Sequence, residues 1–307
     1  MVSGQDTWGC EFCEYPLDSR VEKCQILLEI LVNRRYNVTI NRKWRKKMKR
    51  TMKLIAGVVV LAMLLAVVCA CGGKSNLTAE KGVLVMATNA EFPPYEFWEG
   101  GKIVGIDAEV AEAIATKLGL TLRIDDIDFN AIISTVSSGR ADMGMAGMTV
   151  TEERMESVNF STSYATGVQV IIVKEGSPIT SVDDLFDDGA FYNIGVQEST
   201  TGDIYTSEEL EDEGLAEIYR YRRGADAVQA LVTDRVDCVI IDNEPARAFV
   251  AVNPGLIILD TEYAVEEYAI AFSKSNTALR DAVDGALREL IADGTVQRIV
   301  DKYINAD

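Results

Sequence analysis

The sequence predicts an α/β protein with two lobes, each built on a mostly parallel sheet flanked by helices. Apolar strand patterns alternate with amphipathic helix patterns through most of the 307 residues. The alternation occurs twice in succession, which implies two sheets. If the final helices return to the first lobe, the chain crosses between the lobes twice, near Thr166 and near Thr261. We therefore expect a hinge made of two strands.

The first lobe is expected to hold residues 82–166 and 266–307. Its expected strands are Val83–Thr88, Thr121–Ile127, Ala141–Gly147 and Tyr268–Phe272, and its expected helices are Asp107–Leu118, Asn130–Ser138, Asn276–Ala292 and Thr295–Tyr303. The residues Glu99 to Lys102 form a turn sequence between two short strands. Asp293 and Gly294 separate the last two helices in the manner of a helix end followed by a restart.

The second lobe is expected over residues 167–265. Its strands are predicted at Gln169–Val173, Asn193–Gln197, Glu217–Tyr221, Cys238–Ile241 and Leu256–Leu259. Its helices are predicted at Ser181–Leu185, Thr200–Glu209, Gly224–Thr233 and Glu244–Val252. Each helix lies between two strands, which is the order that a βαβ sheet requires.

The N-terminal part of the chain differs in charge from the rest. Residues 1–70 hold 12 basic and 6 acidic side chains, whereas the remaining 237 residues hold 18 and 42. Basic residues precede an uncharged apolar run, Leu54–Ala70, so residues 48–70 are expected to be a signal peptide. The run ends in a sequence that resembles a bacterial lipobox, with Cys71 after the small Ala70 as the expected lipidated residue, and residues 71–81 as a tether. The alternative is an uncleaved membrane anchor, and both place the remainder outside the cytoplasm.

Residues 1–47 fit no part of a signal sequence and are interpreted as an over-extended start or disordered prefix. Met48 and Met52 are both better starts than Met1, because the basic region of a signal peptide normally begins at the initiator. The alternative is a zinc-binding prefix. Its cysteines, Cys10, Cys13 and Cys24, are one ligand short of a structural zinc site.

Composition excludes several kinds of chemistry. The chain has no histidine, which rules out Ser-His-Asp and Cys-His nucleophilic mechanisms and histidine-based zinc sites. No glycine-rich phosphate motif follows an expected strand, so no nucleotide site is indicated. The acidic mature region would repel nucleic acid and anionic lipid. We expect no metal and no cofactor, and we expect Cys238 to be a small core residue.

The segment Ala146–Arg154 is the most informative stretch of the chain. A buried strand ends at Gly147, and Thr151 follows as an N-cap with Arg154 three residues later. A strand end, a threonine hydroxyl, free helix N–H groups and a guanidinium together suit a small carboxylate. The alternative is a capped helix with a solvated arginine.

Other polar and aromatic residues follow the ends of expected strands. They are Asn89, Phe92, Phe129, Thr200, Thr201 and Asp242. Ligands of open α/β sheets bind at the carboxyl ends of strands, which makes these residues candidates for a binding site. Each has a structural alternative, because Asp242 and the two threonines could cap helices and the aromatic rings could belong to the core.

Several short motifs occur in an order that is similar to one protein family. The motifs are Phe92-Pro93-Pro94-Tyr95, Gly105-Ile106-Asp107, Asp128-Phe129, the segment 146–154, Asn159-Phe160-Ser161, Gly195-Val196-Gln197 and Asp293-Gly294-Thr295. Together they resemble the polar amino-acid-binding proteins of ABC importers, which are type II periplasmic binding proteins. The resemblance covers residues 82–304 and implies the two-lobed fold of that class.

The resemblance implies a role for each candidate residue. Arg154 would fork onto the ligand's α-carboxylate, helped by the hydroxyl of Thr149 and the N–H groups of Thr200 and Thr201. At the other end of the ligand backbone, Asp242 would pair with the α-ammonium and the Gly147 carbonyl would accept a further hydrogen bond. Phe92 and Phe129 would enclose the ligand's side chain. Matching both charges is physically necessary, because an unpaired buried charge costs several kcal/mol.

The sequence departs from the family pattern at two positions. Asn89 stands where several binders of basic amino acids and glutamine have aspartate, and Glu91, Glu96 or Trp98 could compensate. Ser199 stands where glycine is usual, which would stiffen the turn before Thr200.

The resemblance implies a monomeric, lipid-anchored receptor that delivers a free amino acid to an ABC permease. Arginine, glutamine and cystine all remain open as ligands. One alternative is an enzyme similar to cyclohexadienyl dehydratases, with Glu198 or Glu91 as the acid, although cationic residues for a second carboxylate are not evident. The other is a sensing module, although the sequence ends at Asp307 without an output domain.

Overall fold

The computed structural model describes residues 77–304, which belong to one compact unit running from residue 75 to the end of the chain. The expected signal peptide, Cys71 and the cysteine-containing prefix lie outside the described residues. Residues 77–81, which the sequence assigned to the tether, lie against the first lobe: the Ala79 N–H donates to Asp142 Oδ1 over 2.8 Å and Asn276 Nδ2 donates to the Leu77 carbonyl over 2.8 Å. The folded body therefore begins before Val83.

The first lobe contains a five-stranded sheet of order β5-β1-β6-β14-β7. The strands are β1 (Val83–Thr88), β5 (Thr121–Asp126), β6 (Met143–Gly144), β7 (Val158–Phe160) and β14 (Ala271–Ser273). The helices of this lobe are α2 (Ile106–Leu118), α3 (Phe129–Ser137), α4 (Glu152–Ser157), α8 (Thr277–Ala292) and α9 (Thr295–Ile304). A separate three-stranded sheet consists of β2 (Glu91–Phe92), β3 (Glu96–Glu99) and β4 (Lys102–Val104). The turn expected at Glu99 to Lys102 joins β3 to β4.

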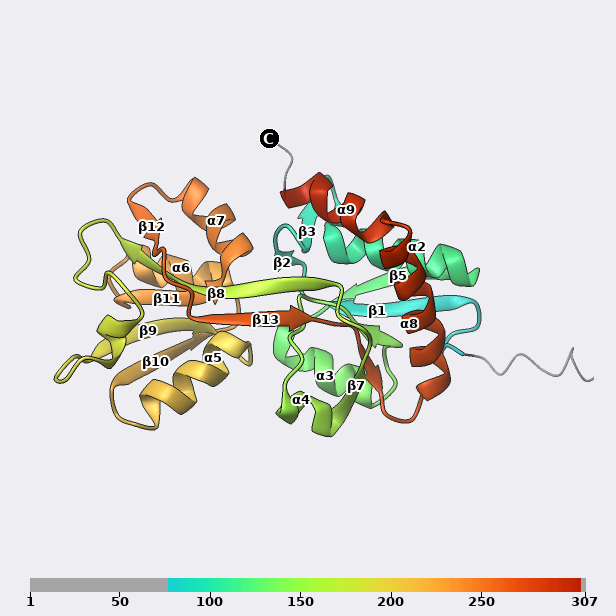
Figure 1. Ribbon diagram of the computed structural model, residues 1–307, viewed down its shortest axis with the longest axis horizontal. Helices are drawn as coiled ribbons and strands as arrows, with labels where there is room; N and C mark the ends of the chain where they lie inside the picture. The colour runs from blue at the N-terminus through green and yellow to red at the C-terminus, as the bar shows by residue number, and fades with distance from the viewer. Residues whose placement is uncertain (1–76, 305–307) are drawn as a thin grey trace, which may run out of the picture. The chain divides into compact units, whose positions relative to one another are not determined.

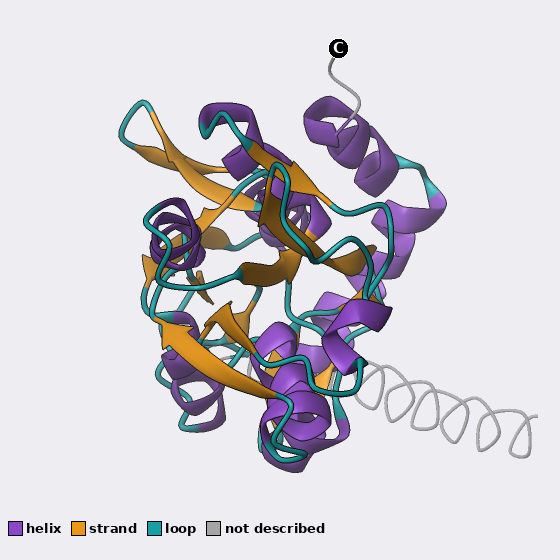
Figure 2. Cartoon of the chain, turned by 90° about the vertical axis from the view of Figure 1, so that its left-hand side faces the viewer, coloured by secondary structure: helices purple, strands orange, loops and turns teal. Residues whose placement is uncertain are grey.

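The second lobe contains a six-stranded sheet of order β10-β9-β11-β8-β12, in which β13 also pairs with β8. Its strands are β8 (Ala165–Lys174), β9 (Tyr192–Gln197), β10 (Ala216–Tyr221), β11 (Cys238–Asp242), β12 (Leu256–Ile258) and β13 (Ala264–Tyr268). Its helical segments are η1 (Asp183–Phe186), α5 (Thr201–Thr206), η2 (Ser207–Glu211), α6 (Gly224–Val232) and α7 (Asn243–Val252). Figure 2 shows helices on more than one side of the strands, while some strands lie uncovered at the left edge of the view.

Two antiparallel strands, β8 and β13, form the connection between the lobes (Figure 1). Residues 165–169 of β8 pair with β13, and the C-terminal part of β8 pairs with β11 and β12. The first crossing therefore includes Thr166 as expected, whereas the return begins at Ala264, after the expected Thr261. We refer to residues 165–169 and 264–268 as the hinge ribbon.

The expectation of mostly parallel sheets agrees with the strand directions. In the first sheet β5, β1, β6 and β7 run in one direction and β14 runs against them, and in the second sheet β8 runs against the other five strands. The expected strand Tyr268–Phe272 is corrected, because it is two strands: β13 belongs to the second sheet and β14 to the first.

Apolar residues fill both sides of each sheet. In the first lobe, Met86 and Val110 pack in a cluster between the sheet, α2 and α8, while Ile132 of α3 packs against the opposite side of the sheet. In the second lobe the buried Cys238 lies in the core as expected. Within residues 77–304, none of the helices has the length and hydrophobicity needed to span a lipid bilayer.

Candidate functional site

All nine residues predicted from the sequence line one pocket between the lobes. They are Asn89, Phe92, Phe129, Gly147, Thr149, Arg154, Thr200, Thr201 and Asp242. The first lobe supplies the first six, and the second lobe supplies Thr200, Thr201 and Asp242. The structure thus brings the candidates together, while their contact with a ligand stays a prediction.

Arg154 is placed by the short helix α4. The Thr151 side chain caps this helix by accepting the Arg154 N–H over 3.1 Å, as the sequence predicts. The guanidinium donates to the carbonyls of Thr149 at 2.7 Å and Ser199 at 3.0 Å, and it lies 5.5 Å from the centre of the Phe129 ring. Only 7% of Arg154 is exposed, and burial lowers its pKa. The side chain is therefore a buried cation that touches both lobes.

The Arg154 bond to Ser199 depends on an unusual backbone conformation. Ser199 has a φ of 64°, in the left-handed region that favours glycine. Its N–H donates to Asp203 Oδ2 over 2.8 Å, which holds the turn in place. The next residue, Thr200, caps α5 but donates its own N–H to the Gln197 carbonyl over 3.3 Å, so this amide is partly engaged in the turn.

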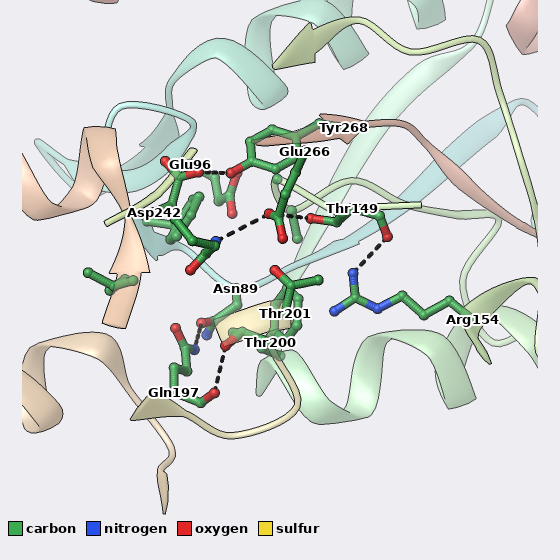
Figure 3. A pocket seen from close by; sticks show the side chains of 16 residues that line it. Asn89, Glu96, Thr149, Arg154, Gln197, Thr200, Thr201, Asp242, Glu266 and Tyr268 are labelled. Carbon is green, nitrogen blue, oxygen red and sulfur yellow. Dashed lines mark hydrogen bonds between the residues drawn. The ribbon is translucent and has the colours of Figure 1, made fainter. Parts of the chain in front are cut away.

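Asp242 stands on the opposite side of the pocket from Arg154, beside Glu96 and Tyr268 (Figure 3). It ends β11 and caps α7 by accepting the Glu244 N–H over 3.2 Å. Its other oxygen accepts the Tyr268 hydroxyl. Asp242 is 1% exposed, and burial raises its pKa to about 7. The capping alternative and the binding role are therefore compatible, since one carboxylate serves both.

Gly147 occupies a position that only glycine fits. Its φ is 53°, and a Cβ there would come within 2.8 Å of Phe92 Cε1. The Gly147 N–H donates to Asp107 Oδ2 over 2.9 Å, which turns the peptide. This buried hydrogen bond orients the backbone at the point where the ammonium of an amino acid is expected.

The sequence did not nominate several polar residues that also line the pocket. They are Glu96, Gln169, Gln197, Glu266 and Tyr268. The sequence predicts Glu96 only as one of three residues that could compensate for the missing acid at Asn89. Gln169 and Glu266 lie on the hinge ribbon, where β13 resembles a charged loop in the sequence. Glu266 and Tyr268 are buried on the same side of β13, but the sequence of this strand, with two consecutive glutamates, has no apolar alternation that reveals it.

The side chains near Asn89 join the two lobes. Gln197 Nε2 donates to Asn89 Oδ1 over 3.0 Å, and Asn89 Nδ2 donates to the Ile127 carbonyl over 3.1 Å. Of the other residues expected to compensate for Asn89, Trp98 is 54% exposed and donates to Asp126, and Glu91 pairs with Arg223. Glu96 is the one of the three that lines the pocket.

Two ion pairs cross from one lobe to the other beside the pocket. Arg222 of the second lobe pairs with Asp128, and Arg223 Nε lies 3.2 Å from Glu91 Oε1. The four side chains are at least partly exposed, so each pair is worth roughly 0.2–1 kcal/mol and is screened by salt. These pairs favour the closed arrangement of the lobes without any ligand.

We expect the double variant Arg222→Gln, Arg223→Gln to bind its amino acid roughly two- to tenfold more weakly at low salt, because the closed state loses two contacts. Calorimetric titration at low ionic strength and at 0.5 M NaCl measures this. The gap between wild type and variant should shrink in 0.5 M NaCl. Arg280→Gln, which removes an ion pair to Asp281 within the first lobe, is the control and should leave affinity unchanged. If wild type and the double variant had equal affinities at low salt, Arg222 and Arg223 would not stabilise the closed arrangement.

Comparisons with known proteins agree with this geometry. The model of the bacterial extracellular solute-binding proteins, family 3, matches residues 84–306. The arginine-binding extracellular protein ArtP of Bacillus subtilis is 32% identical over 264 residues, which cover 84% of this chain and 99% of that protein. An ancestral arginine-binding protein bound to arginine matches with a TM-score of 0.68 and 38% identity, covering 73% of this chain and 98% of its own.

A second solved structure shows another ligand in a similar protein. An ancestral arginine-binding protein bound to glutamine matches with a TM-score of 0.67 and 37% identity, covering 73% of this chain and 99% of its own. The chain thus shares the mixed α/β fold of these structures, with helices on both sides of each sheet. Both of these relatives, ArtP and the ancestral proteins, are named as binding proteins rather than enzymes.

Proposed function

The chain belongs to family 3 of the bacterial extracellular solute-binding proteins, and we propose that the amino acid it binds for an ABC importer is L-arginine. The observation that carries the proposal is a surplus of buried hydrogen-bond acceptors in the pocket. Among the residues that the structure describes, no N–H group, hydroxyl or cation donates to either carboxylate oxygen of Glu96, to one oxygen of Glu266 or to the amide oxygen of Gln169. A ligand that satisfies them must be rich in donors, as a guanidinium with five N–H groups is.

The charges in the pocket support a cationic ligand. Three buried acids, Glu96, Asp242 and Glu266, line it, and Arg154 is the one basic residue among its lining side chains. Arginine has one carboxylate and two positively charged groups, so its net charge of +1 offsets part of the negative charge of the pocket. Glutamine and cystine carry no net charge at neutral pH and leave the excess unchanged. Buried acids without a partner charge are costly, which favours arginine over both alternatives.

The roles that we propose follow the two ends of the pocket. Arg154 and the Thr149 hydroxyl bind the α-carboxylate, with the amide groups of Thr200 and Thr201 facing it from the second lobe. A guanidinium is suited to this because it can form two parallel bonds to a carboxylate. The bond between Arg154 and the Ser199 carbonyl supports this role, since it already holds the guanidinium across the cleft.

The other polar groups divide between the ligand's ammonium and its side chain. Asp242 and the Gly147 carbonyl bind the α-ammonium. The guanidinium of the ligand lies between Phe92 and Phe129, where aromatic faces attract a cation. We assign Glu96 as the acid that pairs with the ligand's guanidinium. Glu96 would thereby replace the aspartate that several binders of basic amino acids have at the position of Asn89.

Calorimetric titration of the folded domain with the twenty amino acids, citrulline and ornithine tests the proposal. We expect arginine to bind at least tenfold more tightly than glutamine or citrulline, because these lack the side-chain charge. Glu96→Gln should reduce that preference, and Glu112→Gln, which changes an exposed glutamate on α2, should not. Tighter binding of glutamine or cystine than of arginine would overturn the choice of ligand, and no binding of any amino acid would overturn the receptor function.

We further propose that the protein is a monomeric receptor rather than an enzyme, anchored outside the cytoplasm through Cys71. The lipobox-like sequence and the family match support this location. Mass spectrometry of the mature protein should detect a diacylglycerol group on Cys71, and an intact N-terminal segment would indicate the uncleaved anchor instead. Turnover of prephenate or arogenate would favour the dehydratase alternative. Co-purification with a permease would favour transport over a sensing role.

A further inference from the structure

Glu96, which lines the pocket, and Asp107, which lies behind it, form a buried pair of carboxyl groups. Glu96 lies on β3 and Asp107 in the first turn of α2, and neither is exposed to solvent. The two acids differ in the number of hydrogen bonds that they accept. Asp107 accepts the Gly147 N–H at 2.9 Å and the Tyr164 hydroxyl at 2.7 Å, whereas within residues 77–304 no N–H group, hydroxyl or cation donates to Glu96, whose one hydrogen-bonding neighbour is the carboxyl of Asp107. Donors stabilise a carboxylate, so Asp107 is the member of the pair that keeps its charge.

We propose that Glu96 holds a proton in the empty pocket and releases it to solvent when a cationic ligand side chain enters, so that the protein exchanges a proton for its ligand's charge. In the release step the O–H bond of the Glu96 carboxyl breaks, its electron pair stays on the oxygen, and the proton passes to the buffer. The ligand's cation then faces the carboxylate in place of the proton. The inference rests on the proposed arginine receptor function and adds a proton to its binding equilibrium.

The surroundings of Glu96 all favour the neutral form in the absence of a ligand. The negative groups that act on it are Asp107 on α2, Asp126 on β5 and Asp242 at the end of β11. Tyrosine rings close the same region: Tyr95 packs against Tyr268, Tyr164 donates to Asp107, and Tyr268 donates to Asp242. Burial, followed by the charge of Asp107, raises the pKa of Glu96 well above its usual range, and burial raises the pKa of Asp107 to about 6.

The exchange would also contribute to specificity. A neutral side chain of similar size, such as that of citrulline, has no positive charge to stabilise the Glu96 carboxylate, so Glu96 stays protonated. Arginine forms a buried charge pair between its guanidinium and the Glu96 carboxylate. The free energy needed to ionise Glu96 is that of releasing its proton to solvent. A lower pH makes this release harder, so the affinity for arginine should fall with falling pH by up to about tenfold per unit, for each proton released.

Asp242 must be separated from Glu96 in any measurement. Its pKa of about 7 predicts that it also loses part of a proton when it pairs with an α-ammonium, which every amino acid carries. Protons released by citrulline therefore report Asp242 alone. The difference between arginine and citrulline isolates the proton that depends on the side chain.

Calorimetric titration at pH 7 in phosphate and in Tris, whose ionisation enthalpies differ, gives the number of protons released per ligand. We expect wild type to release up to about one proton more with arginine than with citrulline. Glu96→Gln should remove this extra proton and flatten the pH dependence of the arginine affinity by one proton. The exposed Glu112→Gln should change neither quantity.

Each outcome has a distinct meaning. Equal proton release for arginine and citrulline in wild type overturns the exchange while leaving the arginine receptor intact. Persistence of the extra proton in Glu96→Gln shows that another group supplies it. If Glu96→Gln does not fold, the wild-type ratio of arginine to citrulline affinity decides, because the exchange requires that ratio to rise with pH. Failure of every amino acid to bind overturns the proposed function itself.

Discussion

Arg154→Ala should lose arginine binding by a factor of roughly 30 to several thousand. Removing one partner of a buried charge pair costs about 2–5 kcal/mol, largely because the other charge stays buried without compensation. Here the charge left behind is the ligand's carboxylate. Because Arg154 also donates to the Ser199 carbonyl, the variant loses a contact between the lobes as well. Isothermal titration measures the affinity, and the melting temperature with and without arginine measures the stabilisation by ligand.

The matched control is Arg140→Ala. Arg140 lies in the same lobe, but it is exposed and bonds only to Ser138 and Thr135. We expect its variant to keep wild-type affinity and the full shift in melting temperature. Arg154→Lys should recover part of the binding, because an ammonium keeps the charge but cannot form two parallel bonds. Wild-type affinity in Arg154→Ala would remove the carboxylate role that we assign to this residue.

Gly167→Ala should weaken binding by tenfold or more and also lower stability. Gly167 lies on the hinge ribbon, opposite Glu266. A Cβ at this position would overlap the Tyr268 hydroxyl and lie 2.5 Å from Asp242 Oδ2. Either the ribbon shifts or Tyr268 moves away from Asp242, and overpacking of this kind costs about 1–3 kcal/mol. Melting temperature and arginine affinity measure the two effects.

Gly285→Ala is the control for a glycine substitution. Gly285 lies within α8, and a Cβ there meets nothing within 4 Å. Alanine in a helix is favoured over glycine by roughly 0.5–1 kcal/mol, so this variant should be slightly more stable and bind normally. If Gly167→Ala bound arginine as well as Gly285→Ala does, the close contact between hinge and Asp242 would have no functional importance.

Most of the helices and central strands follow from local sequence patterns. β1 occurs with the expected bounds, and α2 and α8 differ from prediction by one residue at the N-terminal end. The errors concern strands whose identity depends on partners far away in the chain. β6 is only two residues long, and β13 has two consecutive glutamates that suggest a loop. β13 becomes a strand because β8 supplies its hydrogen bonds, and no local pattern reports that pairing.

The sequence predicts those pocket residues that follow the end of a predicted strand. Arg154 and Asp242 could be nominated because both follow such ends and carry the charges that an amino acid requires. Glu96, Gln169 and Glu266 could not be nominated in this way, since β3, β8 and β13 bring their side chains to the pocket from the middle or start of a strand. The orphaned oxygens of these residues are visible only once the surrounding atoms are placed.

The hinge ribbon supplies part of the pocket wall, through Gln169 on β8 and Glu266 on β13. The ribbon belongs to both lobes, so its side chains line the pocket whether the lobes are open or closed, whereas the bond from Arg154 to the Ser199 carbonyl joins one lobe to the other. We therefore expect changes at Gln169 or Glu266 to alter the association rate of the ligand, and loss of the Arg154–Ser199 bond to alter its dissociation rate.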